Sequence, residues 1–164
     1  MGSPIDRGAL ITEQAAEFRA ALPEGGVLMG LDLGTRTIGT AFCDAGWNFA
    51  SAGKTLPRGK FARDKAALEA LIAERRVRGL VIGLPLNMDG GSGARAQASR
   101  AFARNLAPLG LPVLLWDERW STASAERDMI AQDMSRAKRA ERIDSHAAAV
   151  ILQAAIDRLA GGSF

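Results

Sequence analysis

The chain has 164 residues, of which 48% are apolar and 24% charged, and it carries one cysteine, one histidine and a formal net charge of +3. These values predict one globular domain, exclude a membrane-spanning segment because no apolar run approaches ~20 residues, and weakly favour a polyanionic partner. They also exclude a zinc site built from cysteine and histidine, and the lone Cys43 suits a reducing compartment.

Residues 1–24 are expected to form an N-terminal extension, in which Ser3-Pro4 begins a short helix that the Pro-Glu-Gly-Gly run at residues 23–26 ends. We expect it to pack on the domain or fray. Charged residues interrupt this segment, so we predict no signal peptide and a cytoplasmic location. Residues 25–164 are expected to form the main domain.

The first half of that domain predicts a three-stranded antiparallel meander. The strands are expected at residues 27–33, 37–44 and 49–56, with turns at Gly34 and Gly46. The first strand is apolar on both faces except at Asp32.

The second half alternates helices with apolar strands. Helices are expected at residues 60–76, 92–109, 121–134 and 143–159, and strands at residues 79–84 and 111–116. Helix-linked strands pair in parallel with right-handed crossovers. We therefore predict an α/β fold with a mixed five-stranded sheet, three strands antiparallel and two parallel, flanked by helices.

Three acidic positions lie at the ends of these elements. Asp32 interrupts an apolar strand, where a carboxylate is costly to bury unless it is paired or binds a metal; it could also bond the amides of the following turn. Asp117-Glu118 follows the 111–116 strand, where α/β sheets gather ligands. Alternatively, Asp117 or Ser121 could simply cap the start of a helix, with Glu118 favouring its positive end. Asp144 is the natural N-cap of the last helix.

Together the three acids predict an oxygen-rich site for Mg²⁺ or Mn²⁺. Two such ions can support hydrolysis of a phosphodiester bond without a histidine base. Arginines would neutralise the flanking phosphates: Arg119 follows the acidic pair, and a basic segment precedes Asp144, comprising Arg136, Lys138, Arg139 and Arg142. That segment could equally be a solvated surface loop.

Other features are weaker. Asn87 and Asp89 lie in a Gly-rich loop and could reach a metal or phosphate, but the turn interpretation is favoured. Trp116 and Trp120 flank the acidic pair and could stack on bases, with core packing favoured for Trp116.

Four motifs resemble the RuvX/YqgF family, relatives of the RuvC Holliday junction resolvases. They are the ten-residue runs from Gly30 (GLDLGTRTIG) and Val81 (VIGLPLNMDG), the run from Asp117 (DERWST) and the run from Ile143 (IDSHAA). The resemblance spans residues 27–159, in order. The 1–24 extension has no counterpart in short members, and Arg142 stands where lysine is frequent.

This resemblance implies a ribonuclease-H-like fold with the acidic site at Asp32, Glu118 and Asp144. It implies a nuclease that matures the 5′ end of pre-16S rRNA, with junction resolution in DNA as the alternative. We also predict nucleic-acid contacts from Arg36, Arg119 and the basic segment. The resemblance leaves open whether the chain forms a homodimer. A non-catalytic RNA-binding assembly factor is a further alternative function. An ATP-binding module, which Asp32-Leu33-Gly34-Thr35 also resembles, would need a second copy of the motif.

Overall fold

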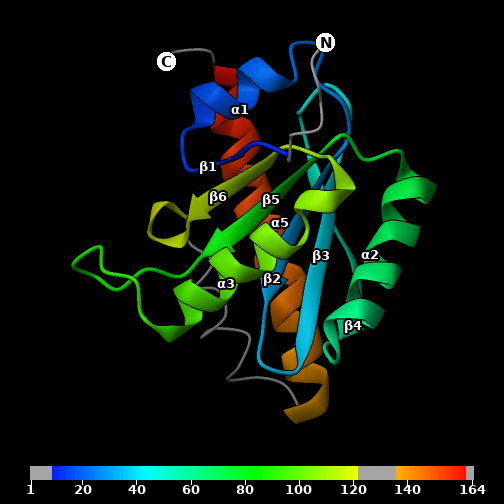
Figure 1. Ribbon diagram of the computed structural model, residues 1–164, viewed down its shortest axis with the longest axis vertical. Helices are drawn as coiled ribbons and strands as arrows, with labels where there is room; N and C mark the ends of the chain where they lie inside the picture. The colour runs from blue at the N-terminus through cyan, green and yellow to red at the C-terminus, as the bar shows by residue number, and fades with distance from the viewer. Residues whose placement is uncertain (1–8, 122–135, 162–164) are drawn as a thin grey trace.

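The computed structural model describes residues 9–121 and 136–161, and for residues 136–144 it describes the helix but not the side chains. A six-stranded mixed sheet forms the centre, with the strand order β1-β6-β5-β2-β3-β4 (Figure 1). The strands are β1 (Ile11–Thr12), β2 (Leu28–Leu33), β3 (Thr37–Cys43), β4 (Ala50–Pro57), β5 (Gly79–Leu84) and β6 (Val113–Asp117). The helices are α1 (Ala15–Ala21), α2 (Phe61–Arg75), α3 (Ala94–Asn105), η2 (Ala107–Leu109), η3 (Glu118–Trp120) and α5 (Arg136–Gly161).

The predicted pairing of the sheet is confirmed. Strands β2, β3 and β4 pair antiparallel, while β5 pairs in parallel with both β2 and β6. Every residue of β2, β5 and β6 is buried, as expected of strands covered on both faces. Their apolar runs, bounded by turn residues, were therefore sufficient to locate them.

The prediction of five strands is wrong in number, because part of the N-terminal extension adds a sixth. Strand β1 pairs in parallel with β6, and an ion pair of 2.6 Å joins Glu13 to Arg100 of α3. The following helix α1 buries Phe18 completely in the core. A two-residue strand is too short to produce a periodic signal, and its place is set by backbone hydrogen bonds to β6. The expected helix start at Ser3-Pro4 lies outside the described residues.

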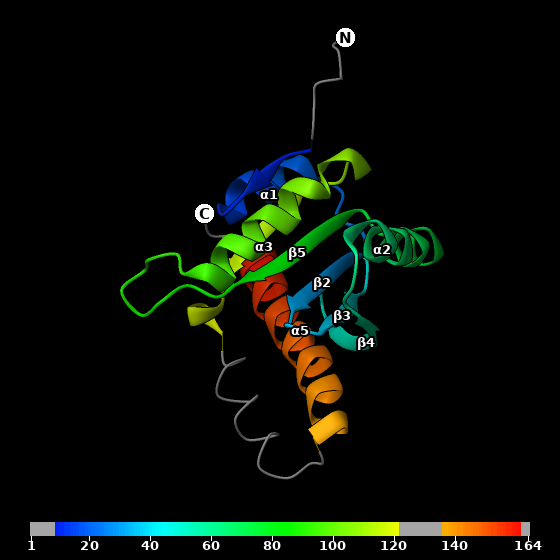
Figure 2. The ribbon, with the colours of Figure 1, turned by 60° about the horizontal axis from the view of Figure 1, so that its bottom comes forward.

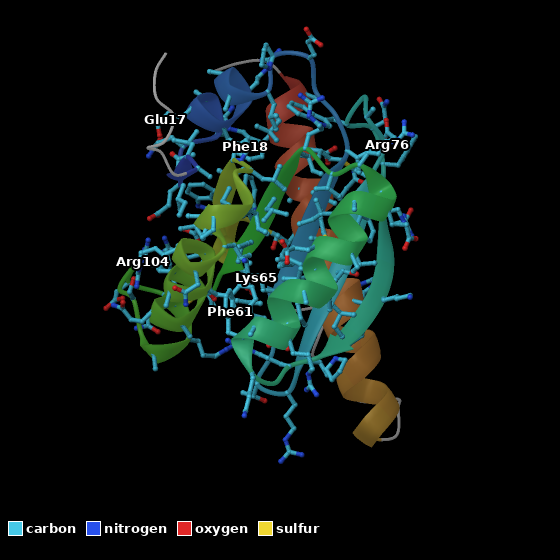
Figure 3. All side chains as sticks on the ribbon, turned by 45° about the vertical axis from the view of Figure 1, so that its right-hand side comes forward. Glu17, Phe18, Phe61, Lys65, Arg76 and Arg104 are labelled. Carbon is cyan, nitrogen blue, oxygen red and sulfur yellow. The ribbon has the colours of Figure 1, made fainter. Side chains whose placement is uncertain are left out.

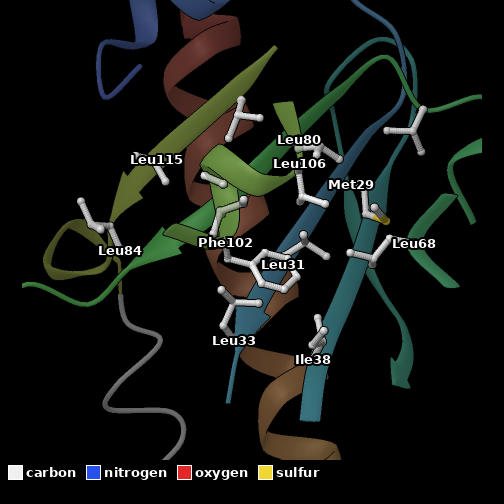
Figure 4. Close-up of a cluster of buried hydrophobic side chains, with 14 of the residues drawn as sticks. Met29, Leu31, Leu33, Ile38, Leu68, Leu80, Leu84, Phe102, Leu106 and Leu115 are labelled. Atoms are coloured by element: carbon white, nitrogen blue, oxygen red, sulfur yellow. The ribbon is translucent and has the colours of Figure 1, made fainter. Parts of the chain in front are cut away.

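Helices cover both faces of the sheet. Helix α5, together with α1, packs on one face, and α2 and α3 pack on the other (Figures 1 and 2). The α2/α3 face holds an apolar cluster that includes Leu31, Leu68 and Phe102 (Figure 4), and Figure 3 views the molecule from the α2 side. No described helix is long and apolar enough to span a lipid bilayer.

Helix α5 differs most from its prediction. We expected it to begin near residue 143, after a basic loop, but it begins at Arg136 and includes the whole basic segment. Arg, Ala, Lys and Glu are strong helix formers, so nothing in residues 136–142 interrupts the helix. The helix expected at residues 121–134 lies outside the described residues except for Ser121, which is extended and follows η3.

Helix α3 ends earlier than predicted. The chain leaves the α-helix after Asn105, and η2 follows at Ala107–Leu109. Pro108 lacks the N–H that a continuing helix needs, and Gly110 then takes a positive φ of 78°. Cys43 is buried at the end of β3, as expected, and burial raises the pKa of its thiol to about 11.

Candidate active site at the carboxyl edge of the sheet

The parallel strands β2, β5 and β6 end at one edge of the sheet. The register pairs Leu31 with Ile82 and Gly83 with Trp116, so the level of Asp32 on β2 lies close to that of Gly83 on β5 and to the end of β6. In Figure 1 the arrows of β5 and β6 end side by side. The first two predicted acids, Asp32 and Glu118, therefore lie at the same edge.

Both carboxylates also lie on the face that α5 covers. A Cβ atom built on Gly30 would come within 2.9 Å of Leu152 Cβ, so Gly30 faces α5, and Asp32, two residues later, faces it too. A Cβ atom on Gly83 would lie 2.7 Å from both Glu118 Oε2 and Ile151 Cδ1. The carboxylate of Glu118 thus occupies the space that the missing side chain of Gly83 leaves open.

These two acids are buried, with Asp32 1% exposed and Glu118 6% exposed. Both engage in further polar interactions within the protein. Two buried carboxylates on one face of a sheet form a concentration of negative charge, which a protein normally retains for a cation or for chemistry.

Asp117 has a different function from its neighbour. Its carboxylate caps η3 by accepting the backbone N–H of Arg119 at 2.9 Å. The guanidinium of Arg119 donates to both carboxylate oxygens, from Nε at 3.0 Å and from Nη2 at 2.6 Å. This hydrogen-bonded guanidinium holds the pKa of Asp117 below its ordinary value. The capping interpretation therefore applies to Asp117, while Glu118 turns towards β5.

Asp144 lies within α5, not at its N-cap as predicted, and its side chain is outside the described part of the chain. Its neighbour Ser145 bonds to Thr55 of β4 through their hydroxyl groups. Thr55 pairs with Gly39, and Gly39 pairs with Asp32. The backbone of α5 at residue 145 is therefore at the level of Asp32 along the sheet.

The direction of α5 brings the preceding turn of the helix towards Asp32. The side chain of Gln153 accepts the Ala50 N–H at 2.8 Å, whereas Ser145 contacts Thr55, so α5 runs antiparallel to β4 and to β2. Ala148 O and Leu152 lie against Gly30. Residue 144 is one turn before Ala148 in α5, and Asp32 is two residues after Gly30 in β2. The two backbone positions therefore lie towards the same edge of the sheet.

Among the described side chains, no group of three or more histidine, cysteine, aspartate or glutamate residues is placed to hold a metal ion. The third predicted acid, Asp144, belongs to the part whose side chains are not described. The donor set that the described chain supplies at this edge, carboxylate oxygen without sulfur or imidazole, suits Mg²⁺ or Mn²⁺.

Two of the predicted nucleic-acid-binding residues, Arg36 and Arg119, lie next to this edge. Arg36 is exposed in the turn between β2 and β3, and Arg119 is exposed beside Glu118. Arg119 Nη1 also donates to Met88 O at 3.3 Å, which ties η3 to the loop after β5. Backbone positions of the basic segment form the first turns of α5, but their side chains are outside the description: Arg136, Lys138, Arg139 and Arg142.

The loop after β5 has the contacts of a turn. Gly90 N donates to Asn87 O at 2.8 Å, Asn87 N donates to Gly91 O at 2.9 Å, and Asp89 Oδ1 accepts Gly91 N–H at 2.8 Å. Asn87 and Asp89 are both exposed. These contacts agree with the favoured turn interpretation.

Two contributors to the site were missed in the sequence. Gly83 provides the space for Glu118, and the available signal was a glycine inside an otherwise apolar strand. Ser145 positions the helix next to Asp144, and nothing in its spacing indicated that contact.

Comparisons with known proteins agree with one another. Residues 26–158 match the family model described as "RuvX: Holliday junction resolvase". A protein of Novosphingobium aromaticivorans, named "Putative pre-16S rRNA nuclease", is 66% identical over 155 residues, covering 94% of this chain and all of that protein. A Sphingopyxis alaskensis protein of the same name is 68% identical over 150 residues, covering 92% and 99%. Most of residues 1–24 therefore have a counterpart in the first relative.

Among solved structures, T. thermophilus RuvC in complex with Holliday junction substrate is similar, with a TM-score of 0.50 and 14% sequence identity. The match covers 81% of this chain and 95% of that chain. At this identity the likeness concerns the fold alone.

Proposed function

Because the chain belongs to the RuvX family, we propose that it is a nuclease that hydrolyses phosphodiester bonds of structured nucleic acid, with precursor 16S rRNA as its substrate in the cytoplasm. Its fold is the ribonuclease-H-like fold that the sequence predicted. The observation that carries the proposal is that Asp32 and Glu118 are both buried on the α5-facing side, at the carboxyl edge of the sheet.

The site fits a divalent cation held by Asp32, Glu118 and Asp144. Asp32 and Glu118 lie at the sheet edge on the side that α5 covers. Asp144 lies in α5, one turn before Ala148, whose carbonyl is against Gly30 of β2. A hard divalent cation would polarise the phosphodiester and make hydroxide available near neutral pH. The protein's own contribution is to hold the carboxylates in place: the open side of Gly83 admits Glu118, and the Thr55–Ser145 contact fixes α5.

Removal of the metal is expected to abolish cleavage. Protein freed of divalent ions with EDTA should leave a precursor 16S rRNA fragment and a four-way DNA junction intact, and Mg²⁺ or Mn²⁺ should restore cleavage of the preferred one. End mapping of the products determines whether cleavage occurs at the 5′ side, as the family resemblance implies. Full cleavage by metal-free protein would contradict the metal assignment.

The same substrate panel separates the competing functions. Selective cleavage of the DNA junction would favour the resolvase that the family description names. Tight, metal-independent binding of the RNA without cleavage would indicate a non-catalytic assembly factor.

The basic first turns of α5 are proposed to grip the phosphate backbone. Arg139→Ala should weaken binding of all nucleic acids uniformly and reduce the slope of log Kd against log salt by about one unit. Filter binding across a salt series measures this. Arg76→Ala is the matched control. Arg76 is exposed at the C-terminal end of α2, just before β5 begins, and so lies at the opposite end of the strands from the acids (Figure 3). Equal slopes for Arg139→Ala and wild type would contradict the assignment.

A further inference from the structure

Trp120 stands out because a large aromatic side chain lies exposed beside the buried acids. It is 64% exposed, whereas Trp116 and Trp47 are 5% and 7% exposed. Met88, on the neighbouring loop, is 90% exposed. Exposure alone does not mark a binding surface, since Phe49 is 77% exposed as well; the place of Trp120 beside the acidic edge is what distinguishes it.

The ring of Trp120 is on the same side of the sheet as Glu118. Trp116 belongs to the apolar cluster under α5 and precedes Glu118 by two residues. The rings of Trp116 and Trp120 meet edge to face, with centroids 5.7 Å apart and an angle of 85°. The buried indole therefore supports the exposed one and fixes its position beside the acidic edge.

The segment that carries Trp120 is held firmly. Arg119 makes a bidentate ion pair with Asp117 and also donates to Met88 O, so η3 and the loop after β5 are joined. The hydroxyl of Ser121 closes η3 by donating to Glu118 O at 3.1 Å. A rigid aromatic face loses little conformational entropy when a flat ligand stacks on it.

The chemistry of this surface favours a nucleobase. Asp117 neutralises much of the charge of Arg119, so the patch is aromatic and apolar more than ionic. The indole itself offers no charge to a phosphate, while every base presents a flat π-face that stacks on an indole without regard to its identity.

We propose that Trp120 is a stacking platform for one unpaired base of the substrate, next to the acidic edge. This rests on the proposed function, since it assigns the nucleic acid to the same edge. A base inside a duplex has both faces covered by its neighbours, so the platform accepts only a nucleotide outside the stack. The protein therefore prefers sites where paired and unpaired nucleic acid meet.

The test compares two RNA hairpins that differ only in their single-stranded extension, one of uridines and the other of abasic riboses with the same phosphates. Binding is measured in an Asp32→Asn background, so that no cleavage interferes. The parent should prefer uridine by about 10-fold. Trp120→Ala should bind both equally, and Trp120→Phe should keep most of the preference.

A fluorescence measurement and a control variant distinguish base stacking on Trp120 from a merely structural role of this residue. Uridine RNA should quench the indole fluorescence of the parent and leave that of Trp120→Phe largely unchanged, since the other two indoles are buried. Phe49→Ala is the matched control, because Phe49 is 77% exposed at the opposite edge, between β3 and β4, and its loss should leave the preference intact. Thermal melting verifies that each variant is folded.

An undiminished uridine preference in Trp120→Ala would overturn the proposal, and so would a parent that binds both RNAs equally. If base preference is present but wild-type protein cleaves nothing, the nuclease proposal fails and the stacking platform stands. If wild type cleaves RNA and shows no base preference, only the platform fails.

Discussion

Asp32→Asn is expected to lower cleavage by more than about 100-fold, because residues that merely support metal ligands already cost 10- to 100-fold when they are removed. Among the acids at this edge whose side chains are described, Asp32 is the most deeply buried, 1% exposed, and its amide analogue keeps the shape while losing the negative charge. Single-turnover cleavage of the preferred substrate with saturating Mg²⁺ measures the effect.

Folding and metal binding can be followed separately from activity. Replacing a buried carboxylate with a neutral group of equal size removes a desolvation cost, so the variant should unfold at the same temperature as wild type or higher. Mg²⁺ should raise the melting temperature of wild type by stabilising the folded state, and this increase should shrink in the variant.

A second buried aspartate provides the control. Asp64 is 4% exposed on the opposite face of the sheet, where its carboxylate oxygens accept the backbone N–H of Gly59 at 3.1 Å. Asp64→Asn keeps an acceptor for that bond and should cleave normally. Equal cleavage by Asp32→Asn and wild type would end the metal-site argument.

Gly83→Ala is expected to lower cleavage by about 10- to 100-fold, although it changes no charged residue. The added Cβ would lie 2.7 Å from Glu118 Oε2 and 2.7 Å from Ile151 Cδ1, and both are ends of side chains. The backbone therefore stays in place, and the Glu118 carboxylate must move away. A displacement of about 1 Å at a catalytic site is enough for an effect of this size.

Gly79→Ala is a matched control at the other end of the same strand. Its Cβ would also meet the ends of side chains, at 2.8 Å from Leu22 Cδ1 and 2.9 Å from Phe18 Cζ. Both variants should lose about 1–3 kcal/mol of unfolding free energy through overpacking. Only Gly83→Ala should lose cleavage per folded molecule, measured at a temperature where both variants are folded. Similar cleavage in the two variants would show that Glu118 is not positioned through Gly83.

Much of the sheet was predictable because its strands are read from local composition. Strand β5 was placed at residues 79–84 without error, and β2 within one residue, since each is a short apolar run between turn residues. The start of α5 was misplaced because the basic segment was interpreted as a loop, although its residues are good helix formers. That error moved Asp144 from the interior of the helix to its N-cap.

Some features of the candidate site could likewise be predicted from the sequence, and others could not. Asp32 and Glu118 could be singled out because an acid within or at the end of a buried strand is costly. The separate functions of Asp117 and Glu118 could not be predicted, since adjacent acids at a strand end differ only in which face each side chain meets. Core packing was favoured for Trp116, which is buried under α5, whereas the exposure of Trp120 depends on its place in η3, beyond the end of β6.

The sequence by itself determined the types of most elements, the antiparallel and parallel pairing of β2 to β6, and which acids are candidates for the site, because hydrophobic period and local chemistry act over a few residues. The tertiary structure alone decided that β1 joins the edge of the sheet, that Gly83 makes room for Glu118, and that α5 passes over β2 at Gly30. Those features depend on contacts between residues far apart in the chain, and each is settled by which backbones can approach closely once the core has packed.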